Sequence, residues 1–490
     1  MKRKFFRSVL AFAIGLQAGN LSAEPTPPQT PNSTAPLVVH EWGTFTSLQN
    51  AQGEAIGGIN TDDEPVPSFV HRFYNYQLIR PTEAPNSVFK GIPSCHPDVT
   101  MRLETPVVYF HPPPGQPALR DVSLSATFHG GWLSEFYPGA ESDAPGVQSN
   151  RMSFGPLRSS TVSTLAWNGL SVGGDWVGPM TDAHVWTSPR AVKAAAVRTA
   201  HGEQEQFLFY RGVAHIDAPL AISQVAKSEE LVLRSQCAPE MCREQALKVN
   251  SLWLVDIRTN GEVAFRPIPP VTLSGGKKFL TRVSSLFNPA DYNTGNRQIL
   301  EASLKRALLA EGLFEDEAQA LLNTWESSYF KSAGLRVFFM VPRAWTDFYL
   351  PLKLSTPAEI TRVMVGRIEL ETPKQQEVLR QIAGLSKARI VEDAKGLMKS
   401  FNERVKADGK GSEKVYTGGT SLAAFGVAVP RSYELYLSLG RFRNALILDE
   451  ARRRPAAGLD SFIAQYRLGG YRPVEQPSAQ SASVKGGPRL

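Results

Sequence analysis

The sequence predicts a mixed α and β protein, in which an N-terminal antiparallel β-sandwich-like domain over residues 37–295 precedes a C-terminal α+β domain over residues 296–470. Two observations lead to this prediction. Up to about residue 271 the chain consists of short apolar runs broken by Gly, Pro, Asn and Ser, which is typical of many short antiparallel strands. From about Arg297 apolar residues recur at helical spacing, and helical segments alternate with strand-like ones.

Three further segments flank the predicted domains. Residues 1–23 have the layout of a secretory signal peptide, with a basic start, an uncharged and mostly apolar stretch at Ser8–Leu21 and the small residue Ala23 before the expected cleavage point. An uncleaved amphipathic anchor is the alternative. Residues 24–36 are rich in Pro, Thr, Ser and Asn and read as a flexible linker, and residues 471–490 read as a disordered tail. We therefore expect a periplasmic or secreted protein with no membrane span after signal cleavage.

The net charge gives little indication of a partner. The formal charge of +7 includes Lys2, Arg3, Lys4 and Arg7, and without these four the chain has 49 basic and 46 acidic residues. Nucleic-acid-binding proteins normally carry a concentrated basic stripe, which this composition does not indicate. We expect no nucleic-acid partner.

The β-rich half contains two well-defined local signals. Residues Leu37–Phe45 predict a strand, in which apolar residues recur on both faces. The runs Leu252–Ile257 and Val263–Phe265 flank the dipeptide Asn260-Gly261, whose tolerance of positive φ angles favours the turn of a β-hairpin.

In the second half the helical period appears first at Leu300, Leu304 and Leu308, and Gly312 stands where a C-terminal cap is expected. A second apolar stripe from Leu321 to Tyr329 completes a predicted helical hairpin. The later predicted elements are strands at Leu335–Val341 and Ile360–Leu370 and helices at Pro373–Ile382 and Arg441–Arg453.

The three cysteines have different predicted roles. Cys237 and Cys242 lie five positions apart, and in an oxidising compartment this spacing favours a local disulfide. A buried thiol pair is the alternative. Cys95 is followed directly by His96, but sequence neighbours rarely form a catalytic pair, so a structural role is expected for Cys95.

All eight histidines lie at or before residue 215, so a histidine-dependent site must draw on the N-terminal half. Alternation along the strand Leu37–Phe45 places His40 and Glu41 on opposite faces, each within an apolar surface. A polar group buried in such a surface needs a partner, since leaving it unpaired costs about 1–3 kcal/mol. His40 and Glu41 are therefore the candidate catalytic residues, and a purely structural hydrogen-bond network is the alternative.

A metal site is the second candidate. Asp62, Asp63 and Glu64 form an acidic cluster, and His71 follows closely. His40, Asp63 and His71 together would supply the two imidazoles and one carboxylate that bind a divalent metal ion. A solvated acidic turn is the alternative for the cluster.

Several strings in the chain resemble a family of exported bacterial proteins of unassigned function that share an N-terminal HEWGTFT motif. That motif is His40-Glu41-Trp42-Gly43-Thr44-Phe45-Thr46 in this sequence. Further matching strings are Glu104–Phe110, Phe209–Val213, Thr324-Trp325, Ser328–Phe330, Val341–Arg343, Thr346-Asp347, Leu350–Leu352 and Val365–Arg367. The resemblance implies export and one continuous architecture, and it implies no mechanism.

Two functions are consistent with these features. The first is a periplasmic or extracellular hydrolase with a His/carboxylate site and one divalent metal ion as its cofactor. The second is a non-catalytic cell-envelope or glycan-binding protein, because six of the eight tryptophans lie between Trp42 and Trp253 and exposed indole rings would suit a sugar ligand. Tryptophan as core filler is the alternative explanation of that clustering.

Overall fold

The computed structural model describes residues 36–61, 66–73, 88–148, 153–242, 246–408, 422–469, 471–474 and 482–484. Residues Pro36–Leu490 form one compact unit. The predicted signal peptide and the linker up to residue 35 lie outside the described residues. The fold is a mixed α and β one, as predicted.

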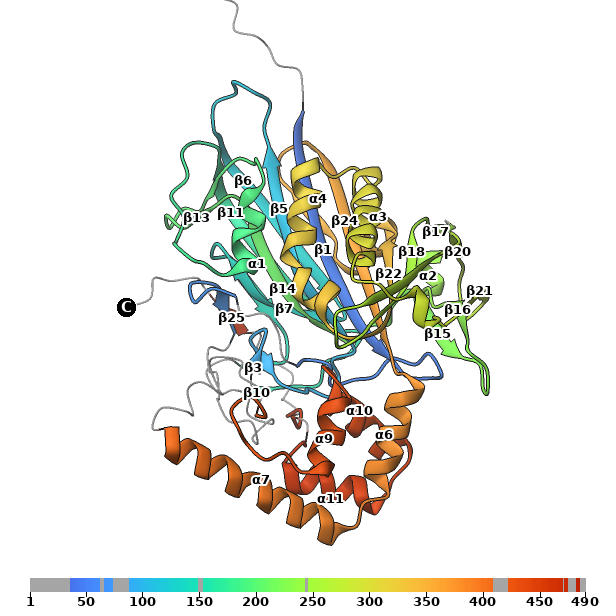
Figure 1. Ribbon diagram of the computed structural model, residues 1–490. Coiled ribbons are helices and arrows are strands. Elements are labelled where there is room, and N and C mark those ends of the chain that lie inside the picture. Colours follow the sequence, from blue (N-terminus) through green and yellow to red (C-terminus); the bar gives the residue numbers. More distant parts are fainter. Residues whose placement is uncertain are drawn as a thin grey trace, which may run out of the picture. The chain divides into compact units, whose positions relative to one another are not determined.

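A nine-stranded sheet forms the centre of this unit (Figure 1). In order across the sheet its strands are β19 (Val263–Ile268), β18 (Leu252–Ile257), β22 (Gly334–Val341), β24 (Ala358–Leu370), β1 (Leu37–Gln49), β5 (Met101–His111), β14 (Leu208–Ala214), β7 (Gly131–Tyr137) and β2 (His71–Arg72). Strand β1 is parallel to β24 and antiparallel to β5. Two strands that follow residue 295, β22 and β24, thus lie between strands that precede it, and the predicted domain boundary lies inside a single unit. Local periodicity cannot reveal such a boundary, because strand partners are chosen in three dimensions.

Smaller sheets complete the β structure. A second sheet contains β13 (Gln204–Glu205), β12 (Val197–Arg198), β11 (Val162–Val172), β6 (Leu119–His129) and β23 (Leu352–Leu354). Strand β8 (Glu141–Ala144) pairs with β11, and β25 (Ala482–Val484) pairs with β8. A three-stranded sheet contains β15 (Leu220–Gln224), β16 (Glu230–Ser235) and β21 (Phe279–Ser284). Two-stranded pairs are β17 (Leu247–Val249) with β20 (Val271–Leu273), β9 (Val147–Gln148) with β10 (Ser153–Phe154), and β3 (Val88–Phe89) with β4 (Ile92–Pro93).

The two faces of the nine-stranded sheet pack against different partners. On one face, an apolar cluster joins residues such as Val39 and Val108 to Leu124 and Trp167 of the second sheet. The other face is covered by α3 (Asn296–Ala310) and α4 (Glu315–Thr324), which Figure 1 shows lying over β1 and β24. A short π-helical turn at Glu326–Lys331 follows α4.

The remaining helices build a second apolar cluster. They are α6 (Pro373–Ala383), α7 (Lys387–Asp408), α9 (Arg431–Ser438), α10 (Arg443–Arg453) and α11 (Ala457–Tyr466). Their core includes Leu48, Ile56 and Ile59, which lie at the end of β1 and just beyond it. Elsewhere in the described part of the chain lie the short helices α1 (His184–Thr187), α2 (Pro239–Cys242) and α5 (Arg343–Tyr349). None of the described helices is long and apolar enough to cross a membrane.

Most locally predicted elements are confirmed. Strands β18 and β19 pair as the predicted hairpin, and Gly261 in its turn has a φ of 84°. Helix α3 ends before Gly312, which has a φ of 104°, and α4 follows as the second arm of the helical hairpin. One element departs from prediction, since Ala482–Val484 of the predicted tail pairs with β8 as a strand. An open strand edge offers unpaired backbone groups that a neighbouring segment can satisfy.

The disulfide prediction is also confirmed. Cys237 and Cys242 are joined by a disulfide, while Cys95 is buried and free. Burial raises the pKa of the Cys95 thiol, so Cys95 is held in its unreactive protonated form.

Gly43 in the centre of β1 has a steric role. Strand β5 bulges opposite it, between the pairs Trp42–Val107 and Thr44–Glu104. A Cβ atom at Gly43 would lie 2.9 Å from the Cα of Pro106 in that bulge. Only glycine leaves room for this close approach between the two strands.

Candidate metal centre

His40 and Glu41 point to opposite faces of β1, as alternation predicts. Glu41 is fully buried, and its Oε2 accepts a hydrogen bond of 2.5 Å from Nε of Arg362 on β24. The Tyr210 hydroxyl donates to the other carboxylate oxygen, and Arg362 also contacts Asp347 at 2.7 Å. Glu41 thus forms a buried ion pair whose contacts link β1, β14 and β24 to α5. The structure does not combine it with His40 in one catalytic site, because the β pleat separates the two side chains.

The predicted metal set is likewise not brought together. His71 lies on the edge strand β2, and β5, β14 and β7 separate it from β1. Its Nε2 lies 2.9 Å from Oε1 of Glu203, which is its carboxylate partner. Asp63 lies outside the described residues. His71, the predicted co-ligand that the structure describes, is therefore not beside His40.

The residues that do lie beside His40 are Glu317 and His111. Nδ1 of His40 donates to Oε2 of Glu317 at 2.7 Å, and Nε2 of His111 donates to Oε1 of the same carboxylate at 2.9 Å. One ligand atom from each of the three residues lies within 4.8 Å of the other two. Because an ionised carboxylate only accepts hydrogen bonds, these two ring nitrogens carry the protons. Two imidazoles and one carboxylate thus converge on a single point.

Strand register brings the two histidines together. His40 on β1 pairs with Tyr109 on β5, so His111, two residues further along β5, projects from the same face. The imidazole centroids are 5.3 Å apart. Phe314 packs against both rings, with centroid distances of 4.4 Å to His40 and 4.9 Å to His111.

The start of α4 supplies the carboxylate. Glu317 is the third residue of the helix, and its Oε2 also accepts a hydrogen bond of 2.8 Å from the backbone N–H of Phe314. This is the reciprocal half of a capping box, which fixes the carboxylate against the first turn. The turn at Gly312 brings α4 close to β24, where an added Cβ would lie 3.3 Å from Thr361. Helix capping thus aims Glu317 at the strand pair that carries the histidines.

The electrostatics of this cluster favour a cation. Burial raises the pKa of Glu317, but hydrogen bonds from His111, His40 and the Phe314 N–H outweigh burial and lower the pKa to about 2. Glu317 is therefore ionised at neutral pH although it is fully buried. Among the described residues, no lysine or arginine lies within ion-pairing distance of this carboxylate. Two imidazole N–H groups, the Phe314 N–H and the start of α4 stabilise this negative charge, and a metal ion bound between the imidazoles would stabilise it further.

Donor identity indicates which metals would fit. Two imidazole nitrogens and one carboxylate oxygen form the protein ligand set of many catalytic zinc and non-haem iron sites, which leave a coordination position for water or substrate. A metal ion would replace the two imidazole protons that now bridge the rings to Glu317.

The sequence indicated only one of these three residues as a ligand. His111 could have been found from register, because it ends the apolar run opposite the His40 strand and shares the face of Tyr109. Glu317 carries no such signal. It lies 277 residues from His40, within an acidic first helical turn that reads as ordinary capping.

Comparisons with known proteins add little to this geometry. No family model matches the chain, and no curated protein matches its sequence. Among solved structures, the chain is similar to a yeast delta-COP-I mu-homology domain complexed with a Dsl1 WxWxV peptide. That similarity has 9% identity and a TM-score of 0.22, and covers 69% of this chain and 96% of the yeast chain. A likeness of this size carries no argument about function.

Proposed function

We propose that this protein is an exported hydrolase of the periplasm or cell exterior that uses one divalent metal ion, such as Zn²⁺, held by His40, His111 and Glu317. A single observation carries the proposal: a fully buried, ionised carboxylate lies between two imidazoles, and no described lysine or arginine neutralises it. The signal peptide predicted at residues 1–23 supports the location.

The geometry also supports access from solvent. His40 is buried, whereas His111 is 14% exposed and Phe314, which covers both rings, is 44% exposed. A substrate would reach the cluster from the side of His111 and Phe314. A bound zinc ion there would lower the pKa of a coordinated water to about 7 and so provide a hydroxide nucleophile.

Metal content of the mature, untagged protein is the first test. We expect about one equivalent of a divalent ion by mass spectrometry, and a melting temperature that falls when chelator removes it. His111→Asn should lose the ion and the chelator effect, whereas His201→Asn, an exposed histidine outside the cluster, should keep both. Apo protein that fails to bind added Zn²⁺ or Co²⁺ would reduce the cluster to a structural hydrogen-bond network.

Hydrolysis needs its own measurement. The metal-loaded protein is assayed against chromogenic carboxylic esters, phosphoesters and anilides. We expect turnover of one of these classes that chelator abolishes and Zn²⁺ restores. Metal binding without turnover of any class would retain the site and exclude the hydrolase.

The glycan-binding alternative receives no support from the tryptophans. Seven of the eight Trp side chains are buried, and Trp176 is half-buried with the guanidinium of Arg190 4.9 Å above its ring. No indole therefore forms an open platform on which a sugar ring could stack. The tryptophans thus give no support to a glycan ligand.

A further inference from the structure

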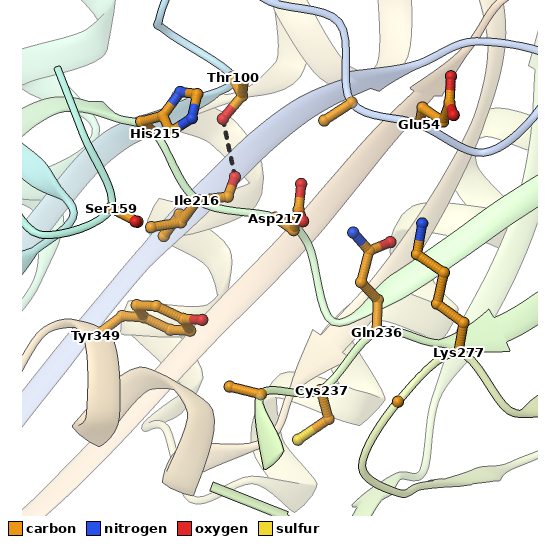
Figure 2. A pocket seen from close by; sticks show the side chains of 13 residues that line it. Glu54, Thr100, Ser159, His215, Ile216, Asp217, Gln236, Cys237, Lys277 and Tyr349 are labelled. Atoms are coloured by element: carbon orange, nitrogen blue, oxygen red, sulfur yellow. Dashed lines mark hydrogen bonds between the residues drawn. The ribbon is translucent and has the colours of Figure 1, made fainter. Parts of the chain in front are cut away.

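A pocket of about 600 Å³ lies at the opposite end of β1 from the metal centre. Its walls come from segments that follow β1, β14 and β16, from the residues just before β21 and from the end of α5 (Figure 2). Its volume is in the range of small-molecule sites, which span about 300–1,000 Å³. Neither His40 nor Glu317 belongs to it, so any ligand here would be independent of the proposed metal ion.

Two loops are fixed side by side to form one wall. Cys237 bridges to Gly275 and Gly276 through backbone pairing, and the disulfide to Cys242 ties the same segment to α2. Gln236 and Lys277, the residues flanking these bridges, therefore reach the pocket from neighbouring loops (Figure 2). This wall is braced before any ligand arrives, which reduces the entropy lost on binding.

The carboxylate and amide oxygens in the pocket have few hydrogen-bond donors near them. Oε1 of Gln236 is buried without a hydrogen-bond partner, and leaving such an acceptor unpaired is costly. Asp217 points into the same space and makes no hydrogen bond or ion pair with a described residue (Figure 2). Glu54 has one partner, the side-chain amide of Asn50 at 3.0 Å. Three acceptors, two of them anionic, suit a ligand ammonium group with its three N–H donors.

The histidine in this pocket adds a fourth acceptor. Nδ1 of His215 donates to the backbone carbonyl of Asp98 at 2.7 Å, so in the neutral ring Nε2 is the unprotonated nitrogen. Tyr349 supplies the complementary donor. Burial raises the pKa of Tyr349 and the charges of Asp217 and Glu240 raise it further, which keeps its hydroxyl protonated.

A cation completes the lining. Lys277 is exposed and lies within ion-pairing distance of neither Glu54 nor Asp217, and it has no other partner among the described residues. Its ammonium group can therefore meet an anionic group on a ligand that occupies the space between them. A pocket that holds unpaired charges of both signs is complementary to a molecule that carries both.

We infer that this pocket binds a small zwitterion, an amino acid or short peptide with a free amino group and a free carboxylate. The ammonium group lies among Asp217, Glu54 and the Gln236 carbonyl, and the carboxylate lies at Lys277. The inference goes beyond the proposed hydrolase, because it depends on a different set of residues.

The test is calorimetric titration of the full-length mature protein. The panel contains the twenty free amino acids and dipeptides with acidic, basic, apolar and aromatic side chains. We expect saturable binding of at least one member, and chelator treatment should leave its affinity unchanged. Loss of binding on chelation would instead assign the ligand to the metal centre. A panel without a single binder would overturn the inference.

Variants then test whether the ligand found in this way lies in the pocket. Asp217→Asn should weaken its affinity about tenfold or more, as expected for the loss of a charge-assisted hydrogen bond, and N-acetylation of the ligand should have a similar effect. Lys277→Gln should weaken binding of the zwitterion but not of its C-terminal amide. Lys278→Gln, a neighbouring exposed lysine outside the pocket, is the matched control and should change nothing. Melting curves confirm that each variant is folded. Unchanged affinity in both Asp217→Asn and Lys277→Gln would place the ligand elsewhere.

Discussion

Replacing Glu317 by Gln tests whether the two imidazoles hold a buried negative charge. Gln keeps the shape of the side chain and removes its charge. In the wild-type protein the pKa of Glu317 falls from its ordinary 4.5 to about 2. At 1.36 kcal/mol for each unit of pKa, this difference corresponds to about 3 kcal/mol of folding free energy at pH 7.

The sign of the pH dependence follows from the direction of that change. A carboxyl group whose pKa is lower in the folded state stabilises the protein above the unfolded-state pKa of 4.5. This contribution is lost progressively as the pH falls from 4.5 to about 2. The deficit of Glu317→Gln relative to wild type should therefore be about 3 kcal/mol at pH 7, about 1 kcal/mol at pH 3, and lost well below pH 2.

Urea unfolding at pH 7 and pH 3 measures both deficits. Chelator-treated protein is used, so that bound metal does not add to the wild-type stability. Glu315→Gln is the matched control, because Glu315 lies in the same helical turn but is 71% exposed and pairs with Lys305 at the surface. A surface pair of this kind is worth at most about 1 kcal/mol. Equal deficits for Glu317→Gln at the two pH values would refute the argument, since the loss would then come from packing and not from charge.

Three further changes test the architecture around the site. Glu41→Gln leaves the Arg362 guanidinium buried without the Glu41 carboxylate and should lower the free energy of unfolding in urea by about 3–5 kcal/mol. Glu359→Gln, at an exposed position on the neighbouring strand, should have little effect, and equal stability of the two variants would argue against a buried ion pair. Gly43→Ala places a methyl group 2.9 Å from the Cα of Pro106 and should lower the free energy of unfolding by about 1–3 kcal/mol. Gly396→Ala, in open space within α7, should raise it by about 0.5–1 kcal/mol, and a change of the same sign in both variants would contradict the steric argument. Reduction, or Cys237→Ser with Cys242→Ser, opens a short loop and should cost about 2 kcal/mol, and an unchanged thermal midpoint would show that the disulfide contributes nothing to folding.

The elements of this fold that the sequence predicts best are those fixed by local patterns. The 3.6-residue period marked α3, the Asn260-Gly261 dipeptide marked the β18–β19 hairpin, and Cys237 with Cys242 lay close enough to bond. Each of these signals acts over a few residues, where the intrinsic backbone and side-chain preferences decide the structure.

The candidate site divides in the same way. Alternation along β1 showed from sequence that His40 and Glu41 face opposite ways and that each, if buried, needs a partner. The identity of those partners was settled elsewhere in the chain: Glu317 for His40 and Arg362 for Glu41 lie 277 and 321 residues away. Only the packing of α4 across the sheet and the parallel pairing of β24 with β1 bring them there. Burial of apolar faces drives that packing without regard to distance along the chain, so a sequence shows that a partner is needed and the tertiary structure decides which one it is.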